Sequence, residues 1–374
     1  MEIIKDQEAG SQRGPVTKSS KVSMEFLLET TINRGSSDLH LIVGTYPTLR
    51  IDGQLVPLND QPILTEKIAE ELILSMLTEE QKDILFKEKE LDISLGLEDE
   101  GRFRVNVFYQ RGTIGAALRL IPSKIRSIQE LGLPLVCEDF TKPSQGFVLV
   151  TGPTGHGKST TLAAMIEKIN QEKPLHIITI EDPIEYIHTS KMSIVDQREL
   201  HLDTHSWSVA LRSALREDPD VVLIGEMRDL ETISAAITIA ETGHLVFATL
   251  HTNNAAQTMD RIIDVFPPRQ QPQIRMQLAS SLLGVISQRL LPRIGGGRVV
   301  ASEVMMATPA IRNTIREGKT HQINNIIQIS GDKGMVSIDK SLASLVRKGE
   351  VSFEDAKAYA IDAANFEKLA KGMH

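Results

Sequence analysis

The chain has 374 residues, of which 41% are hydrophobic, with a formal net charge of −8 and an isoelectric point near 5.8. This length predicts two or three domains with buried apolar cores, and the single cysteine, Cys137, excludes an internal disulfide and a zinc site built from several cysteines. We find no signal peptide and no apolar run of membrane length, so we expect a cytoplasmic protein. The acidic balance disfavours generic binding to nucleic acid, although an oligomeric ring could still enclose a basic pore.

Residues 1–22 mix charged and small polar residues with little apolar periodicity, and we expect them to form a flexible tail. Residues 23–121 then alternate between helical and strand patterns, which predicts a small α+β domain. Its expected elements are a helix from Ser23, a hairpin turn at Asp52-Gly53, helices over 65–77 and 79–87, and strands over 92–95, 102–109 and 113–120.

Three arginines of this small domain share one predicted surface, the arginine face (Arg102, Arg104 and Arg119). In the strand 102–109, the two-residue period places Arg102 and Arg104 on one side and Phe103 on the other. Arg119 projects from the adjacent strand, 113–120. A solvated sheet surface is the simpler explanation. The alternative is that these guanidinium groups, on a separate sheet, reach a phosphate held by another domain.

Residues 122–145 contain three prolines and are expected to form an ordered linker, with the second domain over residues 146–374. A strand pattern at 147–150 leads into a glycine-rich segment, and a helical pattern follows. We call residues 152–159 the glycine loop. The residues predicted to bind the nucleotide are those of the loop and the residue that follows it: Gly152, Pro153, Thr154, Gly155, His156, Gly157, Lys158, Ser159 and Thr160.

The glycine loop fits the pattern G-x-x-x-x-G-K-[ST] at every fixed position. Such a loop directs backbone N–H groups at a polyphosphate, and the following helix adds the positive end of its dipole. Lys158 is expected to reach the β- and γ-phosphates, and Ser159 to ligate Mg²⁺. The sequence therefore predicts a site for a nucleoside triphosphate with Mg²⁺.

Acidic residues end two of the strands predicted downstream. The strand 176–180 runs into a segment that contains Glu181 and Glu185, and the apolar run 221–224 leads to Glu226. Carboxylates at the carboxyl ends of strands point into the crevice where α/β sheets bind ligands. Glu226 thus stands where a Walker B carboxylate would bind Mg²⁺ or its water shell.

Two histidines bracket a third apolar strand, 245–250. His244 precedes this strand and His251 follows it. A single histidine at the end of a strand is more often structural than functional. Two of them around one strand of a nucleotide-binding sheet favour a sensor of the γ-phosphate or of the attacking water.

Beyond Asn254 the chain is predicted to be mostly helical, over 259–265 and 269–288, with a hinge or hairpin at Gly295-Gly296-Gly297 before 299–306. Pro309 suits the first turn of a short helix that Gly318 would end. The polar residues of this helix, Arg312, Asn313 and Arg316, are better placed for docking than for chemistry. The last forty residues repeat the helical pattern and are expected to form a peripheral bundle.

Six blocks together resemble the signatures of the secretion-superfamily hexameric ATPases, and most closely those of the type IV pilus retraction ATPases of the PilT/PilU family. They correspond to an N-terminal signature, a Walker A motif, an Asp box, a Walker B motif, a His box and an AIRN-type motif, at residues 36–40, 152–160, 180–185, 224–229, 242–252 and 310–317. The resemblance covers residues 24–360. It implies a PAS-like N-terminal domain joined to a RecA-like P-loop ATPase domain, assembled as a homohexamer.

The resemblance also implies roles for single residues and partners for the chain. Glu185 would orient the attacking water, Glu226 would be the Walker B carboxylate, and the arginine face would contact phosphate. The implied activity is ATP hydrolysis that drives pilus retraction and twitching motility, in the cytoplasm and peripheral to the inner membrane at the pilus base. The implied partners are the pilus platform protein and a paralogous retraction ATPase, without nucleic acid.

Two positions depart from the family's pattern. His156 replaces the usual small residue of the glycine loop, at a position that contributes mainly backbone, and Thr314 replaces a leucine of the AIRN-type motif. Residues 185–188 and 352–356 also resemble the accessory retraction paralogue. Main and accessory motor therefore both remain open.

Three other functions compete with retraction. A pilus assembly or type II secretion ATPase usually carries a larger N-terminal region and often a four-cysteine zinc insert, and the single cysteine argues against both. The acidic charge argues against a RecA-like DNA translocase. A non-hydrolysing structural paralogue is disfavoured by the presence of Lys158, Glu185 and Glu226.

Overall fold

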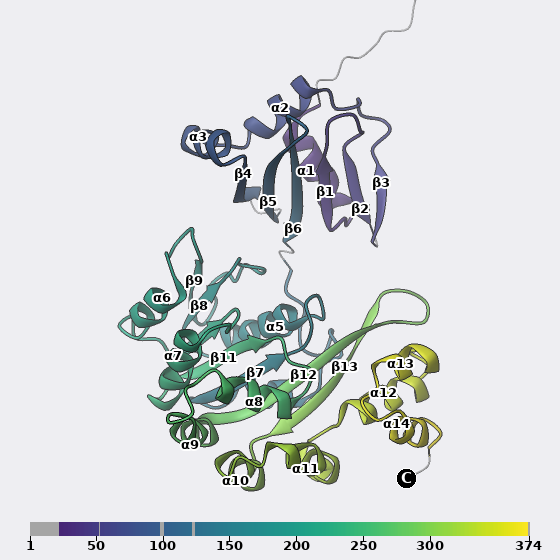
Figure 1. The fold of residues 1–374 in the computed structure, drawn as a ribbon. Helices are drawn as coiled ribbons and strands as arrows, with labels where there is room; N and C mark the ends of the chain where they lie inside the picture. The colour runs from purple at the N-terminus through teal and green to yellow at the C-terminus, as the bar shows by residue number, and fades with distance from the viewer. Residues whose placement is uncertain (1–21, 52, 98–100, 122–123, 373–374) are drawn as a thin grey trace, which may run out of the picture. The chain divides into compact units, whose positions relative to one another are not determined.

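The computed structural model describes residues 22–51, 53–97, 101–121 and 124–372, and the chain divides into two compact units between Ile121 and Pro122 (Figure 1). The predicted tail, residues 1–22, lies outside the described residues except for Val22. Within the described residues, no helix is both long and apolar enough to cross a membrane.

The first unit is an antiparallel sheet whose strands follow the order β3-β2-β1-β6-β5-β4, with helices packed against one of its faces. Its elements are α1 (Met24–Asn33), β1 (Asp38–Leu41), β2 (Thr48–Ile51), β3 (Gln54–Pro57), α2 (Glu66–Leu74), α3 (Glu79–Glu88), β4 (Glu90–Leu97), β5 (Gly101–Gln110) and β6 (Thr113–Ile121). The α+β pattern expected of this region is confirmed.

Short polar residues begin the helices of the first unit. The side chains of Ser23, Thr65 and Thr78 each accept a hydrogen bond from a backbone N–H three residues later, and Thr78 forms a full capping box with Gln81. Such N-caps stabilise a helix by roughly 1 kcal/mol each. The predicted hairpin joins β2 to β3, but Asp52 of its turn lies outside the described residues.

The second unit is built on a sheet with the strand order β13-β12-β7-β11-β10-β8-β9, in which only the β12–β13 pairing is antiparallel. The strands are β7 (Gly146–Thr151), β8 (His176–Glu181), β9 (Ile194–Glu199), β10 (Val221–Ile224), β11 (Leu245–Leu250), β12 (Leu282–Pro292) and β13 (Arg298–Met306). The helices are α4 (Val136–Asp139), α5 (Lys158–Glu172), α6 (Trp207–Ala214), α7 (Leu230–Glu241), α8 (Ala255–Asp264), α9 (Gln271–Ser281), α10 (Pro309–Arg316), α11 (Ile323–Ile329), α12 (Ile338–Arg347), α13 (Phe353–Tyr359) and α14 (Ala363–Ala370).

Helices cover both faces of this sheet. On β7, Phe147 and Leu149 face a core cluster shared with α6–α9, whereas Val148 and Val150 face a second cluster shared with α4 and α5. A strand buried on both faces needs apolar residues at every position. This explains the continuous apolar runs of β10 and β11 and confirms the expected α/β sheet.

Residues 124–145, which we expected to form a linker, belong to the core of the second unit. Ile128, Leu133, Cys137 and Phe140 are buried there with residues of α5 and β7. The prolines of this stretch interrupt its apolar pattern, and for that reason the sequence resembles a linker. The compact unit begins at Pro122 rather than near Gly146.

The predicted helix over 269–288 is wrong from Leu282 onward, where α9 gives way to β12. Most of the side chains from Leu282 to Gln288 are buried, because β12 lies between β7 and β13 with both of its faces covered. The two-residue alternation that would identify a strand is therefore missing. The hairpin prediction at Gly295–Gly297 is confirmed, and α12–α14 pack on the β12–β13 hairpin as the expected peripheral bundle (Figure 1).

Candidate active site

The predicted site residues of the second unit gather at one edge of its sheet. Strands β7, β8, β10 and β11 are parallel, so their carboxyl ends meet at the same edge. The glycine loop follows β7, Glu185 follows β8, Glu226 follows β10 and His251 follows β11. The four segments that the sequence singled out therefore lie at one edge of the sheet.

Lys158 begins α5 and turns back onto its own loop. Its Nζ donates hydrogen bonds to the carbonyl oxygens of Gly152 and Pro153, at 3.0 and 3.2 Å. Burial lowers the pKa of Lys158, and the charges of Glu226 and Glu185 partly offset that decrease. The lysine therefore lies within the electrostatic reach of both carboxylates that the sequence predicted for the site.

Strand β12 supports the glycine loop from the side. Gly152 has a φ of +146°, and a Cβ added to it would lie 2.5 Å from the carbonyl oxygen of Gln288, so only glycine fits there. The amide of Gln288 donates to the carbonyl oxygen of His156 at 2.9 Å. Gln288 is a supporting residue that sequence reasoning missed, because its segment was predicted to be helical.

His156 contributes more than the backbone that we expected of it. Its Nδ1 accepts a hydrogen bond from the backbone N–H of Leu290 at 3.0 Å, and its ring makes an edge contact with Tyr359 of α13, with 6.2 Å between ring centroids. Burial lowers the pKa of His156, as do the charges of Arg289, Lys158 and Arg298. A neutral ring that accepts at Nδ1 agrees with that direction.

Glu226 is held between two basic side chains. Arg228 donates to its Oε2 at 2.8 Å, and Nε2 of His251 lies 3.3 Å from its Oε1. Burial alone would raise the pKa of Glu226, but Arg228 and His251 outweigh it and the pKa is lowered. The carboxylate is therefore ionised at neutral pH. His251 also lies 3.3 Å from the hydroxyl of Thr154, so it connects Glu226 to the glycine loop.

His244 lies at the other end of β11 and does not join this site. Its Nδ1 lies 3.0 Å from the carbonyl oxygen of Ile239, near the end of α7, and 3.2 Å from the hydroxyl of Thr242. The length of β11, roughly 3.3 Å per residue, separates it from His251. The expectation that both histidines act as sensors at one site is therefore corrected for His244, which binds the end of a helix.

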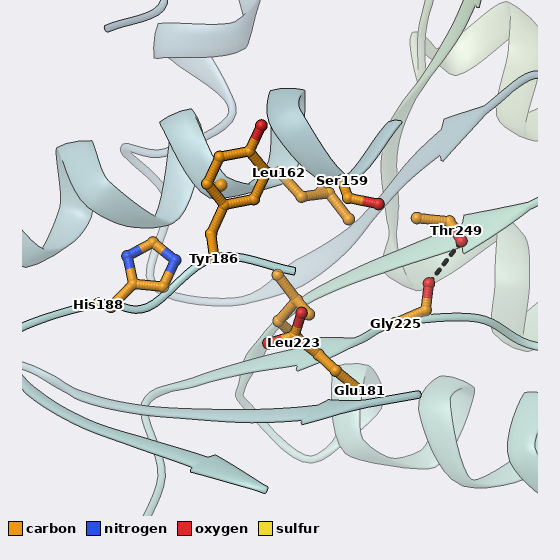
Figure 2. Close-up of a pocket in the computed structure, with 9 residues that line it drawn as sticks. Ser159, Leu162, Glu181, Tyr186, His188, Leu223, Gly225 and Thr249 are labelled. Carbon is orange, nitrogen blue, oxygen red and sulfur yellow. Dashed lines mark hydrogen bonds between the residues drawn. The ribbon is translucent and has the colours of Figure 1, made fainter. Parts of the chain in front are cut away.

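Glu181 lies beneath the same edge, at the end of β8. Burial raises its pKa to about 7, although hydrogen bonds to its Oε1 from Thr179 at 2.8 Å and from Gln197 at 3.3 Å oppose that rise. Glu181 lines a small pocket that also takes in Ser159 and Thr249, whose hydroxyl donates to the carbonyl oxygen of Gly225 (Figure 2).

Gly225, one residue before Glu226, lets neighbouring segments approach closely. A Cβ at this position would lie 3.1 Å from the Cα of Glu181 and 3.5 Å from the ring of Trp207 in α6. The ring of Trp207 therefore packs directly against the end of β10. A larger residue at position 225 would force these three segments apart.

Glu185 has an exposed side chain on the connection between β8 and β9, residues 182–193. The next residue, Tyr186, places its hydroxyl 2.8 Å from that of Thr160, which follows Ser159 on α5. The segment that bears Glu185 is thus bonded to the helix that bears Lys158 and Ser159.

The arginine face lies in the first unit, on β5 and β6. Phe103 is buried while Arg104 and Arg119 are exposed, which confirms the predicted alternation. Arg104 and Arg119 are direct cross-strand partners, and Arg119 donates to Oδ1 of Asp38 at 2.9 Å. Burial alone would raise the pKa of Asp38, but hydrogen bonds from Ser37 and Arg119 lower it overall. Asp38 is an ionised partner that sequence reasoning did not single out.

Arg312 is a structural residue of α10 rather than a docking one. Its Nε donates to the carbonyl oxygen of Ala307 at 2.9 Å, and its NH1 group donates to those of Ser280 at 2.7 Å and of Ala279. It therefore binds the carbonyl end of α9. Asn313 and Arg316 are exposed, so docking remains our interpretation of these two residues.

Two side chains at the sheet edge carry oxygen atoms of the kind that Mg²⁺ prefers. Among the described residues, no group of three His, Cys, Asp or Glu side chains could hold a metal ion by itself. Ser159 and Glu226 offer one hydroxyl and one carboxylate. Mg²⁺ usually keeps several waters and binds one or two protein oxygens together with the phosphates of its substrate.

Comparison with known proteins finds close relatives over almost the whole chain. The family model described as type II/IV secretion system protein matches residues 13–296. The chain is 50% identical over 340 residues to the type IV pilus retraction ATPase PilT of Pseudomonas aeruginosa, covering 91% of this chain and 98% of that protein. It is 41% identical to the type IV pilus ATPase PilU of the same organism, covering 92% and 91%.

A solved structure has the same fold. The crystal structure of the pilus retraction motor PilT with bound ADP matches with a TM-score of 0.88 and 48% identity, over 93% of this chain and 99% of that one.

Proposed function

The chain belongs to the type II/IV secretion system protein family, in its branch of type IV pilus retraction ATPases, and on that basis we propose that it is the motor that retracts a type IV pilus. The observation that carries the proposal is 50% identity to a retraction ATPase over 98% of that protein's length. The match covers 91% of this chain, so it extends through both units.

We further propose that the glycine loop binds the phosphates of ATP. Its backbone N–H groups and the N-terminus of α5 supply positive potential, and Lys158 would exchange its bonds with Gly152 and Pro153 for bonds to phosphate oxygens. The bound ADP of the related structure supports the choice of nucleotide.

Ser159 and Glu226 would hold Mg²⁺, which would neutralise charge that develops on the phosphates. Glu226 is ionised in this arrangement, because Arg228 and His251 hold it as an anion. Glu185 would orient and polarise the attacking water from the β8–β9 connection. His251 contacts both Glu226 and Thr154, and through them it would respond to the state of the phosphates.

The arginine face would supply phosphate contacts from the first unit, and the working assembly would be a homohexamer. Guanidinium groups on a separate unit can stabilise transition-state charge that a single unit leaves exposed. Contact with the pilus platform protein at the inner membrane, and pairing with a paralogous retraction ATPase, belong to the same proposal.

Between main and accessory motor we favour the main one. The identity is 50% to PilT and 41% to PilU, over similar shares of the chain.

The proposal is tested in a strain that carries a deletion of the gene. Retraction predicts many surface pili without twitching, and recovery of twitching with the wild-type chain but not with Lys158→Ala, a control for lost turnover. A strain without pili would instead identify an assembly motor. DNA-stimulated hydrolysis by the purified protein would favour a translocase.

A further inference from the structure

The position of Glu185 depends on residues around it. The β8–β9 connection, residues 182–193, contains no helix or strand, and the side chain of Glu185 is exposed on it. A catalytic group must be held within a fraction of an ångström to act well, and an irregular segment does not provide this by itself. The bonds that anchor the connection therefore decide where Glu185 lies.

Tyr186 provides the first anchor, directly beside Glu185. Its hydroxyl lies 2.8 Å from that of Thr160, and Thr160 directly follows Ser159. Figure 2 shows Tyr186 reaching from the connection toward α5, where Leu162 and Ser159 line the same pocket. One hydrogen bond thus joins the residue after the proposed water-orienting group to the residue after the proposed Mg²⁺ ligand.

His188 provides the second anchor, in the interior. Its Nδ1 lies 3.3 Å from Oε2 of Glu167 on α5, and the two side chains are only 3% and 11% exposed. Burial alone would raise the pKa of Glu167, but hydrogen bonds from His188, Lys191, Gln171 and Asn170 outweigh it and bring that pKa to about 2. Glu167 is therefore an anion that binds the connection strongly.

Asn170 holds the far end of the same connection. Its amide donates to the carbonyl oxygen of Thr189 at 2.8 Å, and its side-chain oxygen accepts from the backbone N–H of Lys191 at 2.9 Å. Thr160, Glu167 and Asn170 are spaced seven and three residues apart, which places them on one face of α5. That face carries three anchors along the helix, and the first of them directly follows the glycine loop.

We propose that Tyr186 and His188 are positioning residues, which fix Glu185 relative to the phosphates through the hydroxyl of Thr160 and the carboxylate of Glu167 on α5. This inference rests on the proposed role of Glu185. It explains why polar residues occupy a helix face that packs against a loop: they transfer the orientation of α5, and so of the glycine loop, to the water-orienting group.

The test measures kcat and KM for ATP in the full-length chain. Tyr186→Phe removes one oxygen, and His188→Leu removes the donor to Glu167. We expect kcat to fall about tenfold or more in each, because a displacement near 1 Å can cost up to about 100-fold, while KM changes less than about threefold. His188→Asn keeps a donor near the place of Nδ1 and should recover most of the loss.

A control variant separates positioning from general stability. His176, at the amino end of β8, bonds Asp196 at 2.9 Å, so His176→Leu also breaks a histidine–carboxylate pair in this unit. It should lower the melting temperature and leave kcat unchanged.

The decisive comparison is made in a Glu185→Gln background. There, Tyr186→Phe and His188→Leu should lower kcat no further, because the group that they position no longer acts. Normal kcat in both single variants, or an equal additional loss in the Glu185→Gln background, would overturn the proposal. Normal turnover in Glu185→Gln alone would refute the role of Glu185, and the positioning role with it.

Discussion

His251 and Glu226, at the carboxyl ends of the adjacent strands β11 and β10, bring Nε2 and Oε1 within 3.3 Å of each other. His251→Asn would break this contact and the link to Thr154. We expect kcat to fall by about 10²-fold or more, as when one positioned hydrogen-bonding group is removed from an active site. The matched control is His244→Asn at the other end of β11, which should shift thermal stability and leave the ATPase rate intact. Equal losses from both variants would contradict the assignment.

Glu185→Gln should bind ATP and hydrolyse it poorly. The amide keeps the size of the side chain but cannot polarise water as a carboxylate does. We expect turnover to fall by about 10² or more, with nucleotide affinity retained in a fluorescent-nucleotide titration. If turnover stayed near normal, the role would pass to Glu226 or to Glu181, whose pKa of about 7 suits a proton acceptor near neutral pH.

Removal of the first unit tests the arginine face. The fragment should begin at Pro122, because residues of the predicted linker such as Cys137 and Phe140 belong to the core of the second unit. We expect the 122–374 fragment to fold, to bind ATP weakly and to turn it over hardly at all, since a phosphate-contacting arginine can contribute about 10³-fold or more. Arg104→Gln in the full chain should reproduce part of that loss. A fragment as active as the full chain would leave these arginines as a solvated surface.

Arg312→Ala and Arg316→Ala should have different effects, although both belong to the AIRN-type motif. Arg312 binds backbone carbonyls at the end of α9, so its removal should destabilise the fold by about 1–3 kcal/mol, as seen by thermal unfolding. Arg316 is exposed, and its removal should change stability by no more than about 0.5 kcal/mol. We expect Arg316→Ala to remain an active ATPase that fails to restore retraction to a deletion strain. Full restoration would exclude Arg316 from docking.

The carboxylate of Glu167, with its hydrogen-bond donors His188, Lys191, Gln171 and Asn170, predicts a pH dependence of stability. Its folded pKa of about 2 lies below the ordinary value of 4.5, so its contribution is fully present above pH 4.5 and is lost as pH falls toward 2. The shift corresponds to about 3 kcal/mol at neutral pH. Urea midpoints of Glu167→Gln should therefore lie below those of the wild type at pH 7 and approach them at pH 3. A difference that does not change with pH would contradict this.

Sequence patterns predicted the parts of the site whose signals are local. The glycine loop, Glu185 and Glu226 each follow a recognisable strand, and the rule that ligands bind at carboxyl ends of parallel strands brings them together. The supporting residues were not predictable in this way. Gln288 meets His156 across 132 residues and Arg119 meets Asp38 across 81. Such contacts are set by strand order, which periodicity does not reveal.

The helix prediction over 269–288 fails at the strand β12 for a related physical reason. Burial on both of its faces removes the alternation by which a strand is recognised, and its apolar run follows directly from the helix α9. The sensor prediction fails for His244 because it treats the two histidines alike, whereas they lie at opposite ends of β11 and have different surroundings.

The packing of Trp207 against Gly225 makes the intrinsic fluorescence of this chain a reporter of one segment. Trp207 is the single tryptophan of the sequence, and it lies against the residue that precedes Glu226. Its intrinsic fluorescence therefore reports on one place, the end of β10, because no other tryptophan contributes to the emission. Movements of that segment during a catalytic cycle can be followed in the unlabelled wild-type chain, by stopped-flow emission, without the introduction of a probe.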